Sequence, residues 1–189
     1  KAMNLPNKLT VFRIFLIPVF MILLIAQWPA GSFTLAGTEI LWSRVVAMIV
    51  FAVASATDWF DGHIARSRGL VTNFGKFADP LADKMLTMTA FIFMVELNLA
   101  PAWVVAIIVC RELAVTGLRL IVVENNGKVM AAAMPGKIKT TCQMLSIIFL
   151  LFGDIFHLGT ILLYLALIFT IYSGYDYFHS SWDVFKGSM

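Results

Sequence analysis

Four aspartates lie in two short stretches of the sequence that could together hold divalent metal ions. Asp58 and Asp61 are three residues apart, and Asp79 and Asp83 are four residues apart. In a helix, residues three or four apart share one face, so each pair forms a stripe of carboxylates. Four carboxylates in one partly dry pocket repel one another unless cations are bound, and hard oxygen donors favour Mg²⁺, Mn²⁺ or Ca²⁺. The spacing therefore predicts a site for hard divalent cations.

Small and basic residues are interleaved with these aspartates. Gly62, Ala65 and Gly75 have little or no side chain, so a flat nucleotide or a diphosphate could approach the helix backbone beside them. Arg66 adds a fixed positive charge that suits a phosphate. Ion pairing of the aspartates with nearby Arg and Lys residues is the structural alternative. Because carboxylates near a membrane are costly, four of them on two facing stripes favour a functional site.

The composition places these residues in a membrane protein. The chain has 189 residues, of which 60% are hydrophobic and 13% charged, whereas soluble domains are about 45–50% apolar and about 25% charged. The apolar residues form long continuous runs and do not alternate, which argues against a membrane β-barrel. Cys110 and Cys142 lie far apart within apolar runs, without the spacing of metal ligands. Nothing resembles a nucleic-acid-binding arm, so the expected partner is the lipid bilayer.

Six hydrophobic segments each approach the roughly 20 residues that a bilayer crossing needs. We expect an all-α bundle of six transmembrane helices, over residues 9–27, 40–60, 80–97, 101–123, 137–153 and 155–178. A short interfacial segment at residues 4–10 is expected ahead of the first helix, which we interpret as a retained helix and not as a signal peptide. A single membrane domain is expected over residues 3–189, with Lys1 and Ala2 left over from expression.

Basic residues indicate how the helices are oriented. They gather at the start of the first segment, around the connections between segments two and three and between segments four and five, and at the C-terminus: Lys8, Arg13, Arg66, Arg68, Lys76, Lys84, Lys128, Lys137, Lys139 and Lys186. The opposite connections contain almost none, Arg44 being the exception. By the positive-inside rule we expect a multi-pass protein of the cytoplasmic membrane, with both termini and the aspartates facing the cytoplasm.

The aspartate region reads D-x-x-D-G-x-x-A-R, eight further residues, and then G-x-x-x-D-x-x-x-D. This pattern resembles the signature of the CDP-alcohol phosphotransferase family, with every specified position filled. Further matches extend the resemblance over most of the chain, namely Asn7-x-Leu9-Thr10-x-x-Arg13, Arg111-Glu112, Gly117-Leu118-Arg119 and Gly136-Lys137-x-Lys139-Thr140-x-x-Gln143. These matches are similar to the family members whose acceptor is glycerol 3-phosphate.

The resemblance implies a fold, a reaction and a set of residue roles. Family members have six transmembrane helices, usually form homodimers and carry two divalent ions, Mg²⁺ or Mn²⁺. They transfer a phosphatidyl group from CDP-diacylglycerol to an alcohol, here sn-glycerol 3-phosphate, and release CMP. The implied metal ligands are Asp58, Asp61, Asp79 and Asp83, with Asp83 also the general base. The residues implied to line the CDP site are Gly62, Ala65, Arg66 and Gly75.

Charged residues in the fourth and fifth segments predict where the acceptor binds. Arg111, Glu112 and Arg119 lie inside a predicted helix, where charge is costly and usually functional. Glu112 and Arg119 share a face, whereas Arg111 is expected to point to a different side. A structural salt bridge between Arg111 and Glu112 is the favoured interpretation, and a catalytic role of the two residues is the alternative. Lys137 and Lys139 follow a Pro-Gly pair at a helix start, which suits an anion. We predict that Arg119, Lys137 and Lys139 hold the acceptor phosphate, with ordinary positive-inside topology the alternative for the lysines.

Several other activities are compatible with the aspartates. Family members that use inositol phosphate, serine or, as in cardiolipin synthesis, phosphatidylglycerol share the signature, although the cations favour a phosphorylated acceptor. An intramembrane prenyltransferase also binds a diphosphate through aspartates, but it needs more helices. A divalent-cation transporter is disfavoured because no inverted repeat is visible. Since no Ser-His or Cys-His pair offers a protein nucleophile, we expect in-line displacement with two metals and an Asp base.

Overall fold

The computed structural model describes residues 4–26, 31–67, 73–124, 134–180 and 182, with side chains at all of these except 5–6, 58–67, 73–77 and 120–124. The elements of this part of the chain are α1 (Leu5–Ile25), β1 (Ser32–Leu35), β2 (Thr38–Leu41), α2 (Trp42–Ser67), α3 (Asn73–Glu96), α4 (Ala102–Glu124), α5 (Met134–Leu151), the 3₁₀ turn η1 (Ile155–His157) and α6 (Leu158–Ser180). Six long helices therefore make up nearly all of the described chain.

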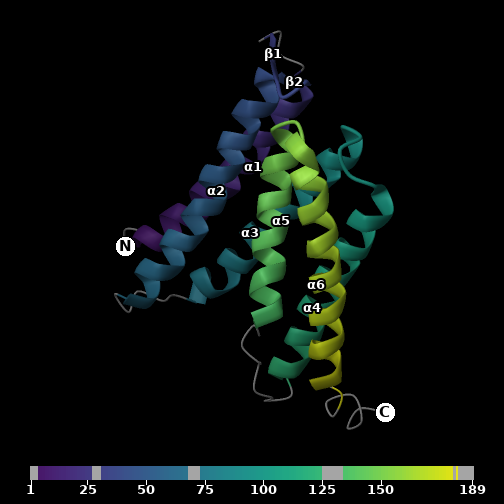
Figure 1. Ribbon diagram of the computed structural model, residues 1–189. Helices are drawn as coiled ribbons and strands as arrows, with labels where there is room; N and C mark the ends of the chain where they lie inside the picture. Colours follow the sequence, from purple (N-terminus) through teal and green to yellow (C-terminus); the bar gives the residue numbers. More distant parts are fainter. Residues whose placement is uncertain (1–3, 27–30, 68–72, 125–133, 181, 183–189) are drawn as a thin grey trace.

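The helices form one bundle, with both chain ends away from the β1–β2 hairpin (Figure 1). α5 packs along α6, α1 packs along α2 and α3, and α4 packs against α6. Large side chains from all six long helices fill the interior, among them the fully buried Phe20, Phe51, Phe91, Ile108, Ile147 and Leu163. The rings of Phe20 and Phe51 lie 5.9 Å apart and join α1 to α2. Burial of such large apolar groups stabilises the bundle.

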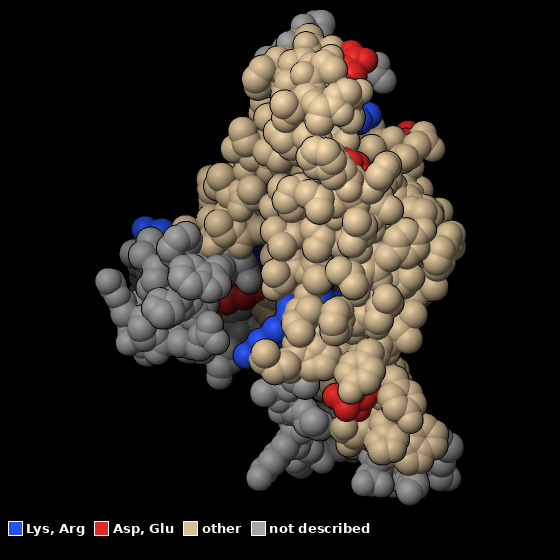
Figure 2. Space-filling view, viewed as in Figure 1, with Lys and Arg blue, Asp and Glu red and all other residues tan. Residues whose placement is uncertain are grey.

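The outer surface of the bundle is also largely apolar. Within the described residues, two helices, Asn7–Ile25 and Ile155–Ser180, are long and apolar enough to cross a membrane, and Trp42–Thr57 is a shorter apolar helix. Figure 2 shows a broad uncharged face, with charged side chains both near the hairpin and toward the opposite end of the bundle. An apolar exterior around hydrogen-bonded helices is what lipid requires. The predicted six-helix membrane fold is confirmed.

Two helix starts lie earlier than the hydrophobic runs suggested. α3 begins at Asn73 and not at residue 80, so Asp79 and Asp83 are its seventh and eleventh residues and do not lie in its first turn. Pro80 is tolerated inside α3, although prolines usually mark a helix start. α1 begins at Leu5, so residues 5–10 continue directly into α1 and are not a separate segment.

A β-hairpin between α1 and α2 was not predicted, and the all-α expectation is corrected to this extent. β1 pairs antiparallel with β2, and both residues of the turn, Ala36 and Gly37, have positive φ as tight hairpins require. Ile40 is fully buried against the turn between α5 and α6, where a Cβ on Gly153 would lie 2.9 Å from the Ile40 side chain. Strands of four residues are too short for hydropathy to reveal.

Candidate active site

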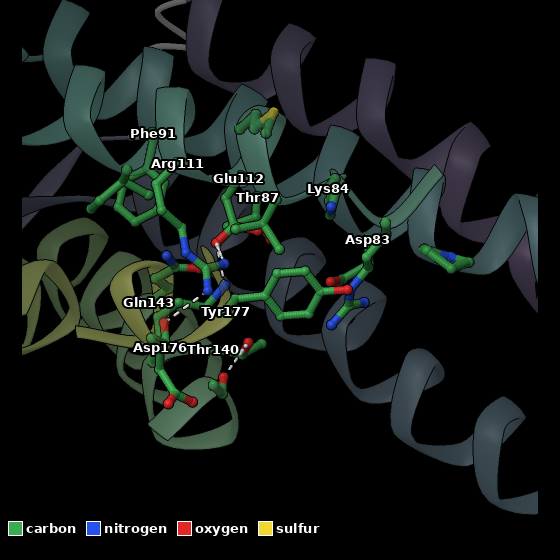
Figure 3. Close-up of a pocket in the computed structure, with 18 residues that line it drawn as sticks. Asp83, Lys84, Thr87, Phe91, Arg111, Glu112, Thr140, Gln143, Asp176 and Tyr177 are labelled. Carbon is green, nitrogen blue, oxygen red and sulfur yellow. Dashed lines mark hydrogen bonds and ion pairs between the residues drawn. The ribbon is translucent and has the colours of Figure 1, made fainter. Parts of the chain in front are cut away.

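A cavity of about 230 Å³ lies between α3, α4, α5 and α6 (Figure 3). The polar residues that line it are Asp83, Lys84, Thr87, Arg111, Glu112, Arg119, Lys139, Thr140, Gln143, Ser173, Asp176 and Tyr177. Apolar side chains, among them Met88, Phe91 and Ile108, complete its wall. Cavities that combine an apolar wall with a few convergent polar groups are the usual form of small-molecule sites.

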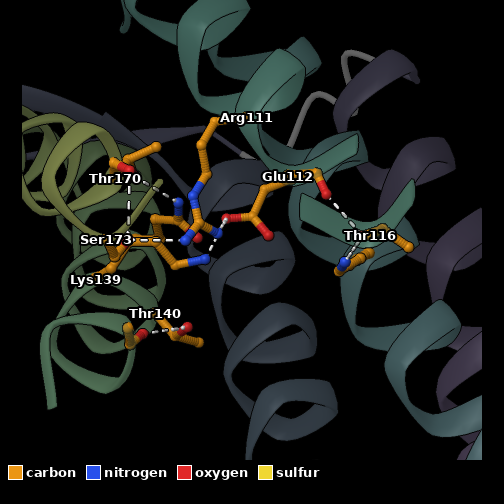
Figure 4. Close-up of polar contacts among 10 residues, drawn as sticks. Arg111, Glu112, Thr116, Lys139, Thr140, Thr170 and Ser173 are labelled. Atoms are coloured by element: carbon orange, nitrogen blue, oxygen red, sulfur yellow. Dashed lines mark hydrogen bonds and ion pairs between the residues drawn. The ribbon is translucent and has the colours of Figure 1, made fainter. Parts of the chain in front are cut away.

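A buried ion cluster joins α4 to α5 across this cavity (Figure 4). The Glu112 carboxylate accepts a hydrogen bond from Lys139 and lies 3.4 Å from Arg111 Nη1. Glu112 is only 8% exposed and Lys139 6% exposed. An unpaired buried charge is strongly destabilising. The Glu112 carboxylate offsets this cost for Lys139 and Arg111, because it pairs with both cations. The predicted salt bridge between Arg111 and Glu112 is confirmed.

Arg111 lines the same cavity as Glu112 and Arg119, so the expectation that it points to a different side of α4 is wrong. Its Nη2 donates to Ser173 Oγ of α6 at 2.8 Å. Gly174 leaves space for the Arg111 side chain, because a Cβ on Gly174 would lie 3.2 Å from Arg111 Cγ. A long, flexible side chain can thus reach a site that the helical position of its Cα does not indicate.

Lys84 provides another cation on the α3 side of the cavity. Its ammonium group donates to Thr116 Oγ1 of α4, and that hydroxyl donates to the Glu112 carbonyl oxygen at 2.6 Å. Lys84 follows Asp83 directly in the sequence, and both line the cavity. The chain of hydrogen bonds therefore fixes a positive charge next to the predicted base.

Arg119 and Tyr177 form a pair between α4 and α6. The Arg119 guanidinium carbon lies 5.4 Å from the centre of the Tyr177 ring, a distance at which a cation is attracted to the ring face. Arg119 Nε and the Tyr177 hydroxyl are both buried and have no hydrogen-bond partner among the described residues. Two buried donors on one cavity wall are suited to a polar ligand.

The three residues predicted to hold the acceptor phosphate do not all meet. Arg119 and Lys139 line the cavity, whereas Lys137 is exposed and is not among its described lining residues. Residues two apart on a helix lie on nearly opposite faces. α5 therefore turns Lys139 inward and leaves Lys137 outside.

The aspartate signature is described in part. Asp83 lines the cavity, and Asp79, one turn earlier on α3, accepts a hydrogen bond from the Thr10 hydroxyl of α1. α2 and α3 are helical through the remaining signature positions and contact each other. The structure describes only the backbone at the other signature positions, Asp58, Asp61, Gly62, Ala65, Arg66 and Gly75. The metal and CDP sites stay predictions.

α1 is tied to the helices that carry the aspartates. Arg13 is 0% exposed, and its Nε donates to the Ala54 carbonyl oxygen of α2 at 3.2 Å. The same nitrogen lies 3.5 Å from Thr57 Oγ1, one residue before Asp58. Together with the hydrogen bond from Thr10 to Asp79, this contact fixes α1 against both halves of the signature.

Sequence reasoning missed the contribution of α6. Ser173, Asp176 and Tyr177 line the cavity, whereas hydropathy predicts only an apolar span for α6. The available signal was the presence of two polar residues, Ser173 and Asp176, in the last third of that span. Polar groups at membrane depth usually face a cavity or a partner helix.

Known proteins resemble this chain over nearly its whole length. Residues 3–172 match the model of the CDP-alcohol phosphatidyltransferase family. The CDP-diacylglycerol–glycerol-3-phosphate 3-phosphatidyltransferase of Bacillus subtilis (strain 168) is 46% identical over 98% of each chain, and the enzyme of that name from Yersinia enterocolitica is 34% identical over 95% of this chain and 96% of its own. A protein described as a probable phosphatidylglycerophosphate synthase of Mycobacterium tuberculosis (strain H37Rv) is 39% identical over 92% of this chain and 79% of its own. The chain therefore belongs to the CDP-alcohol phosphatidyltransferase family.

Proposed function

We propose that this chain transfers the phosphatidyl group of CDP-diacylglycerol to sn-glycerol 3-phosphate and releases CMP. Relatives named for this reaction match the chain over nearly its full length. The structural observation that carries the proposal is that Asp83 shares one cavity with several cations from α3, α4 and α5. A carboxylate that can take a proton, next to cations that can hold a phosphate, is what a phosphorylated alcohol needs in order to attack.

The charges of the cavity suit an anionic acceptor. Among the described lining residues, the cations Lys84, Arg111, Arg119 and Lys139 outnumber the carboxylates Asp83, Glu112 and Asp176. We assign Arg119 and Lys139 to the acceptor phosphate, because a guanidinium and an ammonium group complement its oxygens. Lys137 follows Gly136, which lines the cavity, so we assign it an indirect role, in which its exposed positive charge attracts the anionic acceptor from outside the cavity.

The donor set of the signature fits hard divalent cations. Asp79 and Asp83 lie one turn apart on α3, and the Thr10 hydroxyl holds one of these carboxylates, an arrangement typical of ligating carboxylates. We infer that two Mg²⁺ or Mn²⁺ ions are held by Asp58, Asp61, Asp79 and Asp83. When bound, they would neutralise the diphosphate of the lipid donor. The CDP portion is assigned to Gly62, Ala65, Arg66 and Gly75.

Asp83 acts as the base of the transfer. A neutral alcohol is a poor nucleophile, so a group within hydrogen-bond reach must take its proton. Asp83 accepts that proton while the acceptor oxygen forms a bond to the phosphorus that carries diacylglycerol. The bond between this phosphorus and the bridging oxygen breaks, and CMP leaves with the electron pair. No protein-bound intermediate is needed.

The site is proposed to face the cytoplasm. The basic residues in the first turns of α1, around the connection of α2 to α3, and in and after the connection of α4 to α5 favour the cytoplasmic side for this end of the bundle. There the diphosphate of a lipid would lie at headgroup level while its acyl chains stay in the bilayer, and a water-soluble acceptor could enter from the cytoplasm. We also propose that the enzyme acts as a homodimer, as the family resemblance implies.

A CMP-release assay with purified protein tests this function. With CDP-diacylglycerol and Mg²⁺, we expect CMP to form with glycerol 3-phosphate and not with serine or inositol 3-phosphate. A protein that releases CMP only with another acceptor would refute the assignment of glycerol 3-phosphate. Metal flux into liposomes without any CMP release would instead indicate a transporter.

The Thr10→Val variant tests the link between α1 and Asp79. Removing a group that orients a ligating carboxylate lowers metal affinity by about 10- to 100-fold. We therefore expect the Mg²⁺ concentration for half-maximal activity to rise by that factor, with activity recovered at high Mg²⁺. Thr141→Val is the matched control, because Thr141 is exposed and its hydroxyl bonds to the Lys137 carbonyl of its own helix. An unchanged Mg²⁺ requirement would contradict the role of Thr10.

A further inference from the structure

The Tyr177 hydroxyl takes no part in the proton transfer to Asp83 or in the binding of the acceptor phosphate proposed above. Its oxygen is buried and lacks a hydrogen-bond partner among the described residues. A buried donor without a partner is costly, and such groups in native proteins usually serve a ligand or a bound water. Tyr177 lines the same cavity as Asp83 and Arg119. A ligand bound in that cavity could therefore contact the Tyr177 hydroxyl.

The position of the ring aims this hydroxyl at the reacting end of the cavity. Figure 3 shows Tyr177 extending from α6 across the cavity, with its hydroxyl toward Asp83 of α3. The Arg119 guanidinium occupies the ring face, 5.4 Å from its centre, and holds the ring in place. The hydroxyl therefore lies at the Asp83 end, while the guanidinium lies beside the middle of the ring.

Two other hydroxyls of the cavity wall, those of Ser173 and Thr140, already use their hydrogens. Ser173 donates to the Thr170 carbonyl oxygen at 3.3 Å, and Thr140 donates to the Gly136 carbonyl oxygen at 3.1 Å. Tyr177 differs because its hydrogen has no described acceptor. It is thus a neutral donor that remains available to a neutral acceptor group.

The chemistry of the acceptor indicates what this donor contacts. In the proposed reaction one hydroxyl of glycerol 3-phosphate meets Asp83, and its phosphate meets Arg119 and Lys139. The remaining secondary hydroxyl lies between these two ends of the molecule. We propose that the Tyr177 hydroxyl donates a hydrogen bond to this secondary hydroxyl, and so makes the enzyme specific for phosphorylated vicinal diols. This inference rests on the proposed function, and Tyr177 is a specificity-determining residue in it.

Comparing two acceptors in wild type and Tyr177→Phe tests the inference. The second acceptor, 3-hydroxypropyl phosphate, keeps the reacting hydroxyl and the phosphate but lacks the secondary hydroxyl. Loss of one hydrogen bond is expected to lower kcat/KM for glycerol 3-phosphate by about tenfold in Tyr177→Phe. The variant's kcat/KM for 3-hydroxypropyl phosphate and its KM for CDP-diacylglycerol should stay within about twofold of wild type, since the ring and its contact with Arg119 remain.

A matched control is available two residues away on α6. Tyr175 is 69% exposed, so Tyr175→Phe should leave both acceptors unaffected. Equal losses with the two acceptors in Tyr177→Phe would show a structural role and overturn the inference, as would unchanged kinetics. Wild type must itself prefer glycerol 3-phosphate over 3-hydroxypropyl phosphate, and the lack of that preference would overturn the inference without any variant. Absence of CMP release from wild type with glycerol 3-phosphate would instead refute the proposed function.

Discussion

The Asp83→Asn variant should lose CMP release by about 10³-fold or more, because the amide cannot accept the proton of the acceptor hydroxyl. Asn has nearly the same shape as Asp, and Asp83 is only one of four aspartates of the signature. CMP binding is therefore expected to stay within about tenfold of wild type. CMP release and calorimetric CMP binding, measured on the same preparation, separate the two effects.

A control carboxylate lies at the other end of the bundle. Asp154, in the turn between α5 and α6, accepts hydrogen bonds from the Thr160 backbone and hydroxyl. Asp154→Asn keeps an oxygen acceptor there, so its activity should remain close to wild type. Turnover by Asp83→Asn at the wild-type rate would remove Asp83 as the base. A loss of both turnover and CMP binding would show that Asp83 serves mainly to hold the nucleotide.

The Glu112→Gln variant should be the most destabilising change in the cavity. The substitution removes the negative charge that Lys139 and Arg111 share. Breaking a buried pair by neutralising one partner costs about 3–5 kcal/mol, because the other charge stays buried. For a chain of this size that corresponds to a fall in Tm of roughly 10 °C, measurable by thermal unfolding in detergent. Activity should fall as well, because Lys139 and Arg111 lose their fixed positions.

A second substitution distinguishes charge from packing. If the unpaired cation causes the loss, Lys139→Met in the Glu112→Gln background should restore part of the Tm, because it removes that charge. Glu39→Gln is the control, since Glu39 is exposed on the β-hairpin, and its Tm should not change. A Tm of Glu112→Gln equal to that of wild type would show that Glu112 does not stabilise the cluster.

Local patterns in the sequence determined the membrane fold and the predicted base. Long apolar runs identify helices without reference to the rest of the chain, because a bilayer crossing needs a minimum length of apolar residues. Asp79 and Asp83 share a helix face by spacing alone, since a helix repeats every 3.6 residues. The same periodicity places Lys137 and Lys139 on different faces, although the sequence argument grouped them. The β-hairpin was missed because its strands are short and its turn geometry depends on two residues.

Only the tertiary structure decided which helices face one another. Thr10 bonds to Asp79, 69 residues away, and Arg111 bonds to Ser173, 62 residues away. Periodicity along one helix cannot reveal such contacts, because it does not specify the helix that packs opposite. Arg111 reaches the cavity because Gly174 of α6 leaves space for its stem, and Tyr177 enters it because α6 packs on α4. The aspartates and their helical spacing were thus set by the sequence, whereas the packing of α4, α5 and α6 assembled the cavity beside Asp83.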